Sequence, residues 1–200
     1  MLEEILRLDT ELFLYLNNLG TPSFDSFWTL LSKKEANIAV YLSCLLFFLL
    51  NKGFKSYNIK PLDVFYIFSI VLVMIIVSDQ SANIIKDSFQ RLRPCYNEII
   101  QDSVRLVKES CGGRYGFFSA HASNSFSLAV FFGLLFRDFS KYPIYFTIIF
   151  ASFISYSRVY LGVHYPLDII FGGLFGVING LVIYRVHEII LKRFNFFNKS

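Results

Sequence analysis

Long apolar stretches alternate with polar ones along most of the chain. Five of the apolar stretches approach the ~20 residues that a helix needs to cross a bilayer, and they cover residues 35–51, 62–82, 118–136, 142–157 and 166–186. The polar stretch at residues 83–117 carries too many charges to lie in lipid. The pattern therefore predicts an all-α, polytopic transmembrane helix bundle of about five spans, with a polar extracytoplasmic loop between the second and the third.

The chain begins with a different pattern, that of an amphipathic helix over residues 2–19. Its apolar and charged side chains fall on different parts of the helical wheel. The apolar set is Leu2, Ile5, Leu6, Leu12, Leu16 and Leu19, and the charged set is Glu3, Glu4, Arg7 and Glu11. Such a helix either lies in the membrane interface or packs against the bundle. The sequence GTPSFDSFW then predicts a break, and an extra short span near residues 20–33, which would make six spans, remains an alternative.

Composition agrees with a membrane protein. Hydrophobic residues make up 54% of the chain and charged residues 17%, whereas a soluble domain carries about 25% charged residues. We find no linker, internal repeat or low-complexity tract, so residues 1–200 are expected to form one domain. The acidic start MLEEILRLDTE lacks the basic region of a signal peptide, and none is expected.

The distribution of Lys and Arg predicts how the spans are oriented. If five spans alternate, one side holds the basic residues Lys52, Lys55, Lys60, Arg137, Lys141, Arg185, Lys192, Arg193 and Lys199. The positive-inside rule makes that side cytoplasmic. The polar loop and residues 157–166 then face the periplasm or exterior. We expect a multi-pass protein of the inner (cytoplasmic) membrane without a nucleic-acid partner, and an oligomer is not predicted.

The first polar island on the exterior side is KDSFQRLRP. Lys86 and Arg93 are seven residues apart, so on a continuous helix they share one face, while Arg91 points away. Pro94 then ends the helix. Two cations aimed the same way suit an anion, although positive residues also anchor span ends in lipid headgroups.

Two further islands bring histidines to the same side. In CGGRYGFFSAHASNS, Ser119 and His121 stand where the third span begins, and a helix start offers free N–H groups to an anion. In SRVYLGVHYPLD, Arg158 ends the fourth span, and His164 and Asp168 are four residues apart. A carboxylate beside an imidazole fixes its tautomer and stabilises its charged form. An ordinary helix cap and a structural ion pair are the alternatives for these two islands.

Together the islands predict a phosphate site. Three cations, two histidines, a serine, backbone amides and one carboxylate would meet at one membrane surface. Isolated polar residues at membrane depth are functional by default, and Arg, Lys and backbone N–H groups are the usual donors to phosphate. Nothing in the sequence resembles a set of metal ligands, so no metal and no cofactor are expected.

The spacings also resemble a known family, the type 2 phosphatidic acid phosphatases. The resemblance rests on K-x6-RP, FSAH and SR-x5-H-x3-D, which cover the motif-bearing core at residues 83–168. The family's middle motif is usually Pro-Ser-Gly-His, so Phe118 replaces Pro and Ala120 replaces Gly. Ala120 keeps the backbone N–H that the family uses as a donor to phosphate.

The resemblance implies a mechanism and a set of roles. His164 would attack phosphorus and form a phosphohistidine, and Asp168 would orient it. His121 would protonate the leaving oxygen and then activate water. The phosphoryl oxygens would be held by Lys86, Arg93, Ser119, the Ala120 N–H and Arg158.

The position of the site at a bilayer surface predicts a membrane lipid phosphate as substrate. Small bacterial members of the resembled family act on undecaprenyl pyrophosphate, phosphatidylglycerol phosphate, phosphatidic acid or the phosphates of lipid A. The short chain and the external face favour undecaprenyl pyrophosphate among these. An anion-binding membrane transporter is the alternative from another class, but the charges lie at span ends and no inverted repeat is present.

Cysteine and glycine positions predict two packing features. Cys95 and Cys111 flank the polar loop on the expected exterior face, where we predict a disulfide, with two free thiols as the alternative. Gly172, Gly176 and Gly180 recur every four residues in the fifth span, which lets another helix approach closely. Packing within the monomer is favoured over dimerisation.

Overall fold

The computed structural model describes residues 1–50, 61–137 and 140–194. In these ranges the regular structure is helical, which confirms the predicted all-α fold. The α-helices are α1 (Leu2–Asn18), α2 (Pro22–Leu31), α3 (Lys34–Leu50), α4 (Pro61–Phe89), α5 (Ala120–Leu135), α6 (Tyr142–Tyr160) and α7 (Pro166–Phe194). The predicted turn around Lys52, Lys55 and Lys60, and also Lys199, lie outside these ranges.

Each of the five predicted spans is a helix, α3 to α7 in chain order. Two of them, Leu62–Phe89 and Pro166–Arg193, are 28 residues long and apolar enough to cross a membrane, with mean hydropathies of 2.2 and 1.9. At ~1.5 Å per residue each is longer than the ~30 Å hydrocarbon core. The helix α5 is a shorter apolar helix, and the total number of spans stays a prediction.

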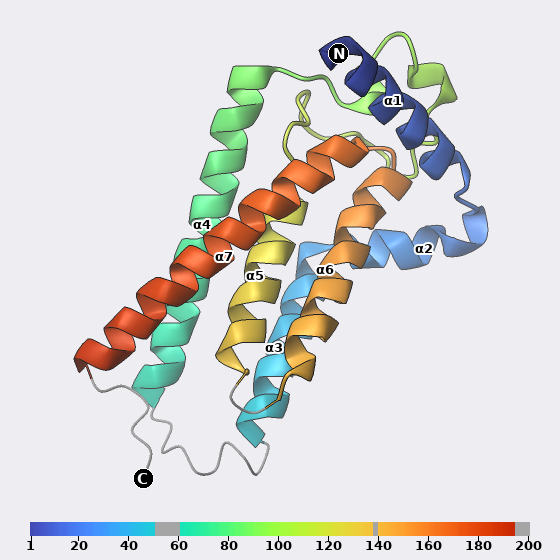
Figure 1. The fold of residues 1–200 in the computed structure, drawn as a ribbon. Helices are drawn as coiled ribbons and strands as arrows, with labels where there is room; N and C mark the ends of the chain where they lie inside the picture. Colours follow the sequence, from blue (N-terminus) through green and yellow to red (C-terminus); the bar gives the residue numbers. More distant parts are fainter. Residues whose placement is uncertain (51–60, 138–139, 195–200) are drawn as a thin grey trace.

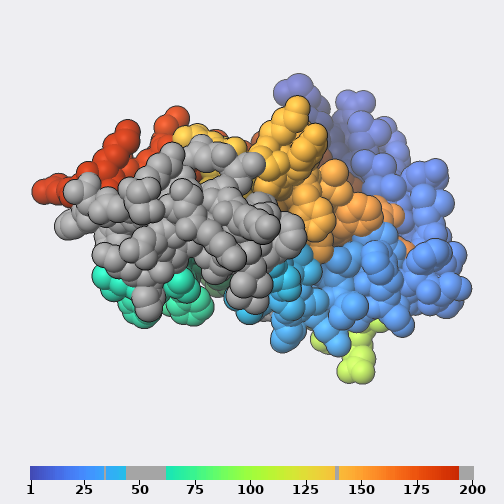
Figure 2. Space-filling view, turned by 90° about the horizontal axis from the view of Figure 1, so that it is seen from below, coloured from blue at the N-terminus to red at the C-terminus, as the bar shows by residue number. Residues whose placement is uncertain are grey.

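The helices α3 to α7 form a bundle in which α5 packs against α4, α6 and α7 (Figure 1). The segment between α4 and α5 lies at the same end of the bundle as α1, whereas α7 ends at the opposite end. Seen from that opposite end, α4 and α7 lie on one side, and α2 and α3 lie on the other (Figure 2). One end of the bundle therefore collects the polar loop and the helix ends that carry the predicted motifs.

The predicted glycine row packs α7 directly onto α5. A Cβ atom at Gly172 would stand 2.5 Å from the carbonyl oxygen of Ser119, and one at Gly180 would stand 2.7 Å from that of Ser127. A Cβ atom at Gly176 would collide with the carbonyl oxygen of Ser123. These approaches confirm packing within the monomer as the use of the glycines, because only glycine lets the two backbones come this close.

The N-terminal segment differs in part from its prediction. The helix α1 is present and buries Asp9, Phe13 and Asn17, one residue per turn, in contact with α6 and α7. The segment predicted to break the helix is largely a helix itself, α2. Its Pro22 stands at the first helical position, where proline is well tolerated because its missing N–H has no partner within the helix. Ten residues span only ~15 Å, so α2 is too short to be the sixth span.

Long-range hydrogen bonds fasten this segment to the polar loop and to α6. The Asn17 amide nitrogen donates to the carbonyls of Arg105, Val159 and Tyr160 at 3.1, 3.1 and 2.9 Å. Both carboxylate oxygens of Asp25 on α2 accept from the Arg105 guanidinium, at 2.6 and 2.7 Å. The loop itself is closed by a disulfide between Cys95 and Cys111, whose Cα atoms are 6.3 Å apart.

Candidate active site

A cavity of about 370 Å³ opens where the motif-bearing helix ends meet. Its walls come from α3, α4, α5, α6 and the segments that follow α4 and α6. The lining includes six of the predicted site residues, namely Lys86, Arg93, Ala120, His121, Arg158 and His164. The structure therefore brings residues of all three polar islands to one place.

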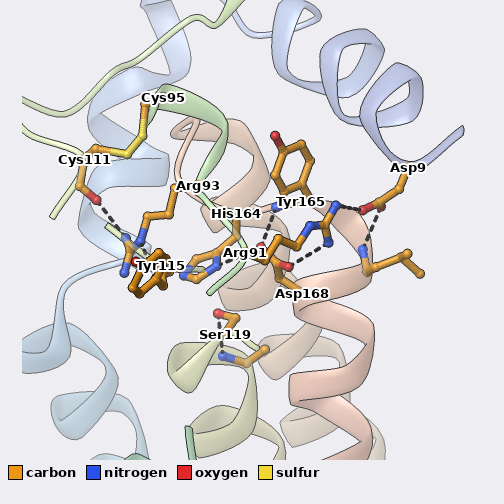
Figure 3. A network of polar contacts seen from close by, with 12 residues as sticks. Asp9, Arg91, Arg93, Cys95, Cys111, Tyr115, Ser119, His164, Tyr165 and Asp168 are labelled. Carbon is orange, nitrogen blue, oxygen red and sulfur yellow. Dashed lines mark hydrogen bonds and ion pairs between the residues drawn. A yellow bond between two sulfur atoms is a disulfide. The ribbon is translucent and has the colours of Figure 1, made fainter. Parts of the chain in front are cut away.

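Lys86 and Arg93 converge on the cavity by a route that the sequence did not predict. The helix α4 ends at Phe89, and Gln90, with a φ of 50°, turns the chain out of the helix. Arg93 therefore lies in the following loop, and its relation to Lys86 is not that of one helix face. Its Nε donates to the Tyr115 carbonyl at 3.2 Å, and its Nη1 donates to the Cys111 carbonyl at 2.7 Å (Figure 3). Two backbone oxygens, one of them from a disulfide-bonded cysteine, thus hold this guanidinium in position.

The start of α5 presents its first turn to the cavity. Ser119 is fully buried, and its Oγ caps the helix by accepting from the Ala122 N–H at 3.4 Å. Its own N–H donates to the Asp168 carbonyl at 3.0 Å, which ties α5 to the start of α7. Ala120 and His121 line the cavity directly. The positive dipole end of α5 lies in this first turn, where an anion is stabilised.

Arg158 is a buried cation at the end of α6, with only 4% of its surface exposed. One of its terminal nitrogens donates to the Ser32 hydroxyl. Its Nε is buried and has no hydrogen-bond partner among the residues that the structure describes. A buried charged donor without a partner is costly, so an anionic oxygen in the cavity would satisfy it.

His164 and Asp168 form the predicted pair. The His164 Nδ1 lies 3.3 Å from the Asp168 Oδ2, which also accepts from the Tyr165 N–H at 3.0 Å. Burial lowers the pKa of His164 well below its ordinary value of 6.5, and the positive charges of Arg93, Arg158 and Lys86 lower it further. The imidazole is therefore neutral near pH 7, and with Nδ1 at the carboxylate its Nε2 is the nitrogen left for chemistry.

The helical spacing predicted that Arg91 points away from the site, and this prediction was wrong. Its Nη1 donates to the Asp168 Oδ1 at 2.9 Å, and its Nη2 donates to the Asp9 Oδ2 at 2.5 Å (Figure 3). The helical wheel does not apply to Arg91, because α4 ends two residues before it. The sequence did not identify Asp9 as a site residue either. Its four-residue spacing to Phe13 could have shown that it lies on the buried face of α1 and not on the exposed, charged face.

The cavity also has a polar wall on α3, α4 and α5, formed by Asn37, Asp79, Asn83 and Asn124. The Asn124 amide nitrogen donates to the Asp79 carboxylate at 2.7 Å. The side-chain oxygens of Asn37 and Asn124 are buried and find no hydrogen-bond donor in the described part of the chain. A ligand carrying hydroxyl or amide donors would fit this wall. In the same ranges, no three His, Cys, Asp or Glu side chains are grouped as a metal site.

Comparisons with known proteins agree with this geometry. The sequence pattern of the PAP2 superfamily matches residues 62–191. The lipid A 4'-phosphatase of Porphyromonas gingivalis is 34% identical over 188 residues, which are 93% of this chain and 75% of that protein. The lipid A 4'-phosphatase of Bacteroides thetaiotaomicron is 33% identical over 187 residues, 93% of this chain and 80% of that protein.

A solved structure shares the fold. The crystal structure of a PAP2-type phosphatidylglycerolphosphate phosphatase from Bacillus subtilis superimposes with a TM-score of 0.66 and 17% identity. The superposition covers 96% of this chain and 89% of the other.

Proposed function

The chain belongs to the PAP2 superfamily and is a membrane lipid phosphatase, and we propose that it removes the 4'-phosphate of lipid A by way of a phosphohistidine. The observation that carries this proposal is the convergence on one cavity of three cations and two histidines, one of which pairs with a buried carboxylate behind it. Charge that develops on a phosphoryl group is stabilised best by donors already in place, in a site that excludes water.

In the first step, the neutral His164 attacks phosphorus through Nε2. The N–P bond forms as the P–O bond to the lipid breaks, and His121 gives its proton to the leaving oxygen. Asp168 keeps Nδ1 protonated and stabilises the positive charge that the ring acquires. Lys86, Arg93 and Arg158 face the charge on the three equatorial oxygens from the cavity wall.

In the second step, water replaces the lipid oxygen. His121, now neutral, takes a proton from the water as its oxygen attacks phosphorus. The N–P bond breaks, its electron pair returns to His164, and inorganic phosphate leaves. His121 is protonated again at the end, so both histidines return to their starting states, and the first turn of α5 supplies N–H donors throughout.

Two observations support lipid A as the substrate. The relatives from Porphyromonas gingivalis and Bacteroides thetaiotaomicron, each more than 30% identical, are lipid A 4'-phosphatases. In addition, the unpaired oxygens of Asn37 and Asn124 suit a headgroup that carries hydroxyl and amide donors. Undecaprenyl pyrophosphate, which the short chain favoured, carries no such donors beyond its phosphates, and we now place it second.

The test is a panel of lipid phosphates with the purified protein in detergent and EDTA. Bisphosphorylated lipid A, undecaprenyl pyrophosphate, phosphatidylglycerol phosphate and phosphatidic acid are compared by phosphate release, and fragmentation mass spectrometry locates the phosphate that lipid A loses. We expect the fastest release from lipid A, at the 4' position. Faster release from another lipid, or loss of the 1-phosphate, would overturn the substrate assignment, and a carrier would release no phosphate from any of them.

We further propose that the site faces the periplasm from the inner membrane. The basic residues counted for orientation and the disulfide of the polar loop support this side. A reporter enzyme fused after residue 200 should be active only in the cytoplasm. A C-terminal reporter active in the periplasm would reverse the orientation.

A further inference from the structure

An unbroken row of charged groups joins the N-terminal helix to the proposed nucleophile. Asp9 on α1 binds Arg91, Arg91 binds Asp168, and Asp168 binds His164, at 2.5, 2.9 and 3.3 Å (Figure 3). Arg91 connects the two carboxylates through different terminal nitrogens. The two acids are therefore coupled through one shared guanidinium.

The row lies in a low-dielectric place, where each charge depends on the next. The side chain of Asp9 is 2% exposed, that of Asp168 is 0% exposed, and that of Arg91 is 18% exposed. A buried carboxylate that loses its cation becomes protonated or moves to water. Either change at Asp168 alters its bond to the Nδ1 of His164, on which the tautomer of the nucleophile depends.

Asp9 also fixes the piece of backbone that carries the pair. Its second carboxylate oxygen accepts from the Leu167 N–H at 2.9 Å, in the first turn of α7. The Arg91 guanidinium lies 4.1 Å from the ring centre of Tyr165, three residues before Asp168. One carboxylate from α1 therefore holds both the start of α7 and the cation that faces Asp168.

We propose that Asp9 and Arg91 are positioning residues of the reaction, which act through Asp168 to hold His164 for attack on phosphorus. The inference rests on His164 being the nucleophile. The competing explanation is a purely structural role, in which Asp9 and Arg91 only attach α1 to the bundle. The two explanations differ in what they predict, because a structural contact affects stability alone, whereas a positioning residue also affects turnover.

The experiment compares the variants Asp9→Asn, Arg91→Ala and their combination with two matched controls. Glu11→Gln removes an exposed ion pair on the same helix, 2.6 Å from Arg7. Asp25→Asn removes an ion pair that fastens the neighbouring helix to the loop but does not lead to His164. For each variant, kcat and KM are measured on the lipid phosphate that the wild type hydrolyses fastest, together with the unfolding midpoint in detergent and the rate of phosphohistidine formation.

The expected result is a fall in kcat without a matching rise in KM. Asp9→Asn should lower kcat about tenfold and Arg91→Ala about a hundredfold, as for small displacements of a reacting group, and both should slow phosphohistidine formation. The combined variant should be no slower than Arg91→Ala, because Asn keeps an oxygen that can accept from the Leu167 N–H, and the negative charge it loses acts through Arg91. Asp25→Asn should lower the unfolding midpoint and keep kcat, and Glu11→Gln should change neither.

Three outcomes would overturn the inference. The first is an unchanged kcat in Asp9→Asn. The second is a combined variant in which the effects of Asp9→Asn and Arg91→Ala on kcat multiply. The third is a loss of kcat in Asp25→Asn equal to that in Asp9→Asn. Because the assay uses whichever lipid phosphate the wild type prefers, an error in the substrate assignment leaves this test intact. A wild type that forms no phosphohistidine would instead refute the proposed mechanism itself.

Discussion

Replacing Gly176 by Ala should loosen the contact between α5 and α7 and reduce activity with it. The new Cβ atom would collide with the carbonyl oxygen of Ser123, and the Cβ of Phe126 would lie 3.0 Å away. A backbone oxygen inside a helix cannot move away by a change of rotamer, so the two helices must separate. Gly173→Ala is the matched control, because its Cβ would meet the ring of Phe126 at 3.1 and 3.2 Å, and a ring can turn.

The magnitude follows from two opposed effects. Overpacking at a well-packed contact costs about 1–3 kcal/mol, and Gly→Ala in a helix gains about 1 kcal/mol in propensity. Because the clash is with a backbone oxygen, the cost for Gly176→Ala lies at the upper end of this range, and the net loss is roughly 2 kcal/mol. At roughly 2–4 °C per kcal/mol for a chain of this length, the unfolding midpoint should fall by about 4–8 °C. Gly173→Ala should be neutral or slightly stabilising.

The assay is thermal unfolding of both variants in one detergent, with phosphate release measured below the transition. Activity should fall in Gly176→Ala, because α5 begins with the turn that bears His121 and α7 begins with the turn that bears Asp168. A Gly176→Ala protein as stable and active as the wild type would refute the reasoning. A changed oligomeric state at unchanged stability would show instead that the glycines serve a dimer.

Three further predictions concern the site and the loop. His164→Ala should abolish turnover and phosphohistidine formation while the unfolding midpoint changes little, and residual phosphate release at the wild-type rate would contradict its assignment. Burial and nearby cations lower the pKa of His164 below 6.5, so kcat/KM should stay constant as the pH falls to 6.5 and decline only below that pH. A decline of kcat/KM centred above pH 6.5 would show that the resting imidazole is charged. Reduction and alkylation should add mass at Cys95 and Cys111 and destabilise the protein by about 3 kcal/mol for a loop of 16 residues, whereas alkylation without reductant would show free thiols.

Hydrophobic pattern predicted the five helices of the bundle because each needs a long apolar surface, and that surface is visible in sequence. It failed at their ends. Polarity ended the second apolar span at Ala82, and Pro94 was expected to end its helix, yet α4 ends at Phe89, because the backbone already turns at Gln90. The helix α2 was expected only within the alternative of a short span near residues 20–33, because the sequence GTP is as typical of a break as of a helix start.

The candidate site was predictable wherever chemistry follows from short spacings. His164 and Asp168 are four residues apart, and the structure pairs them as the spacing indicates. Arg91 and Asp9 are 82 residues apart, and their contact depends on the path of a loop that no periodicity describes. The polar wall of the cavity was missed for another reason, since single residues such as Asn37 and Asp79 inside apolar stretches do not interrupt the apolar pattern.

The contacts of α1 can form only late in the synthesis of the chain. Asp9 binds the backbone of Leu167, 158 residues later in the chain, and Asn17 binds that of Tyr160, 143 residues later. The first helix to leave the ribosome therefore cannot complete its contacts until the last helix has been synthesised. A nascent chain released before α7 would lack Asp168, the proposed partner of His164, so we expect a prematurely terminated product to release no phosphate from the lipids of the membrane that receives it.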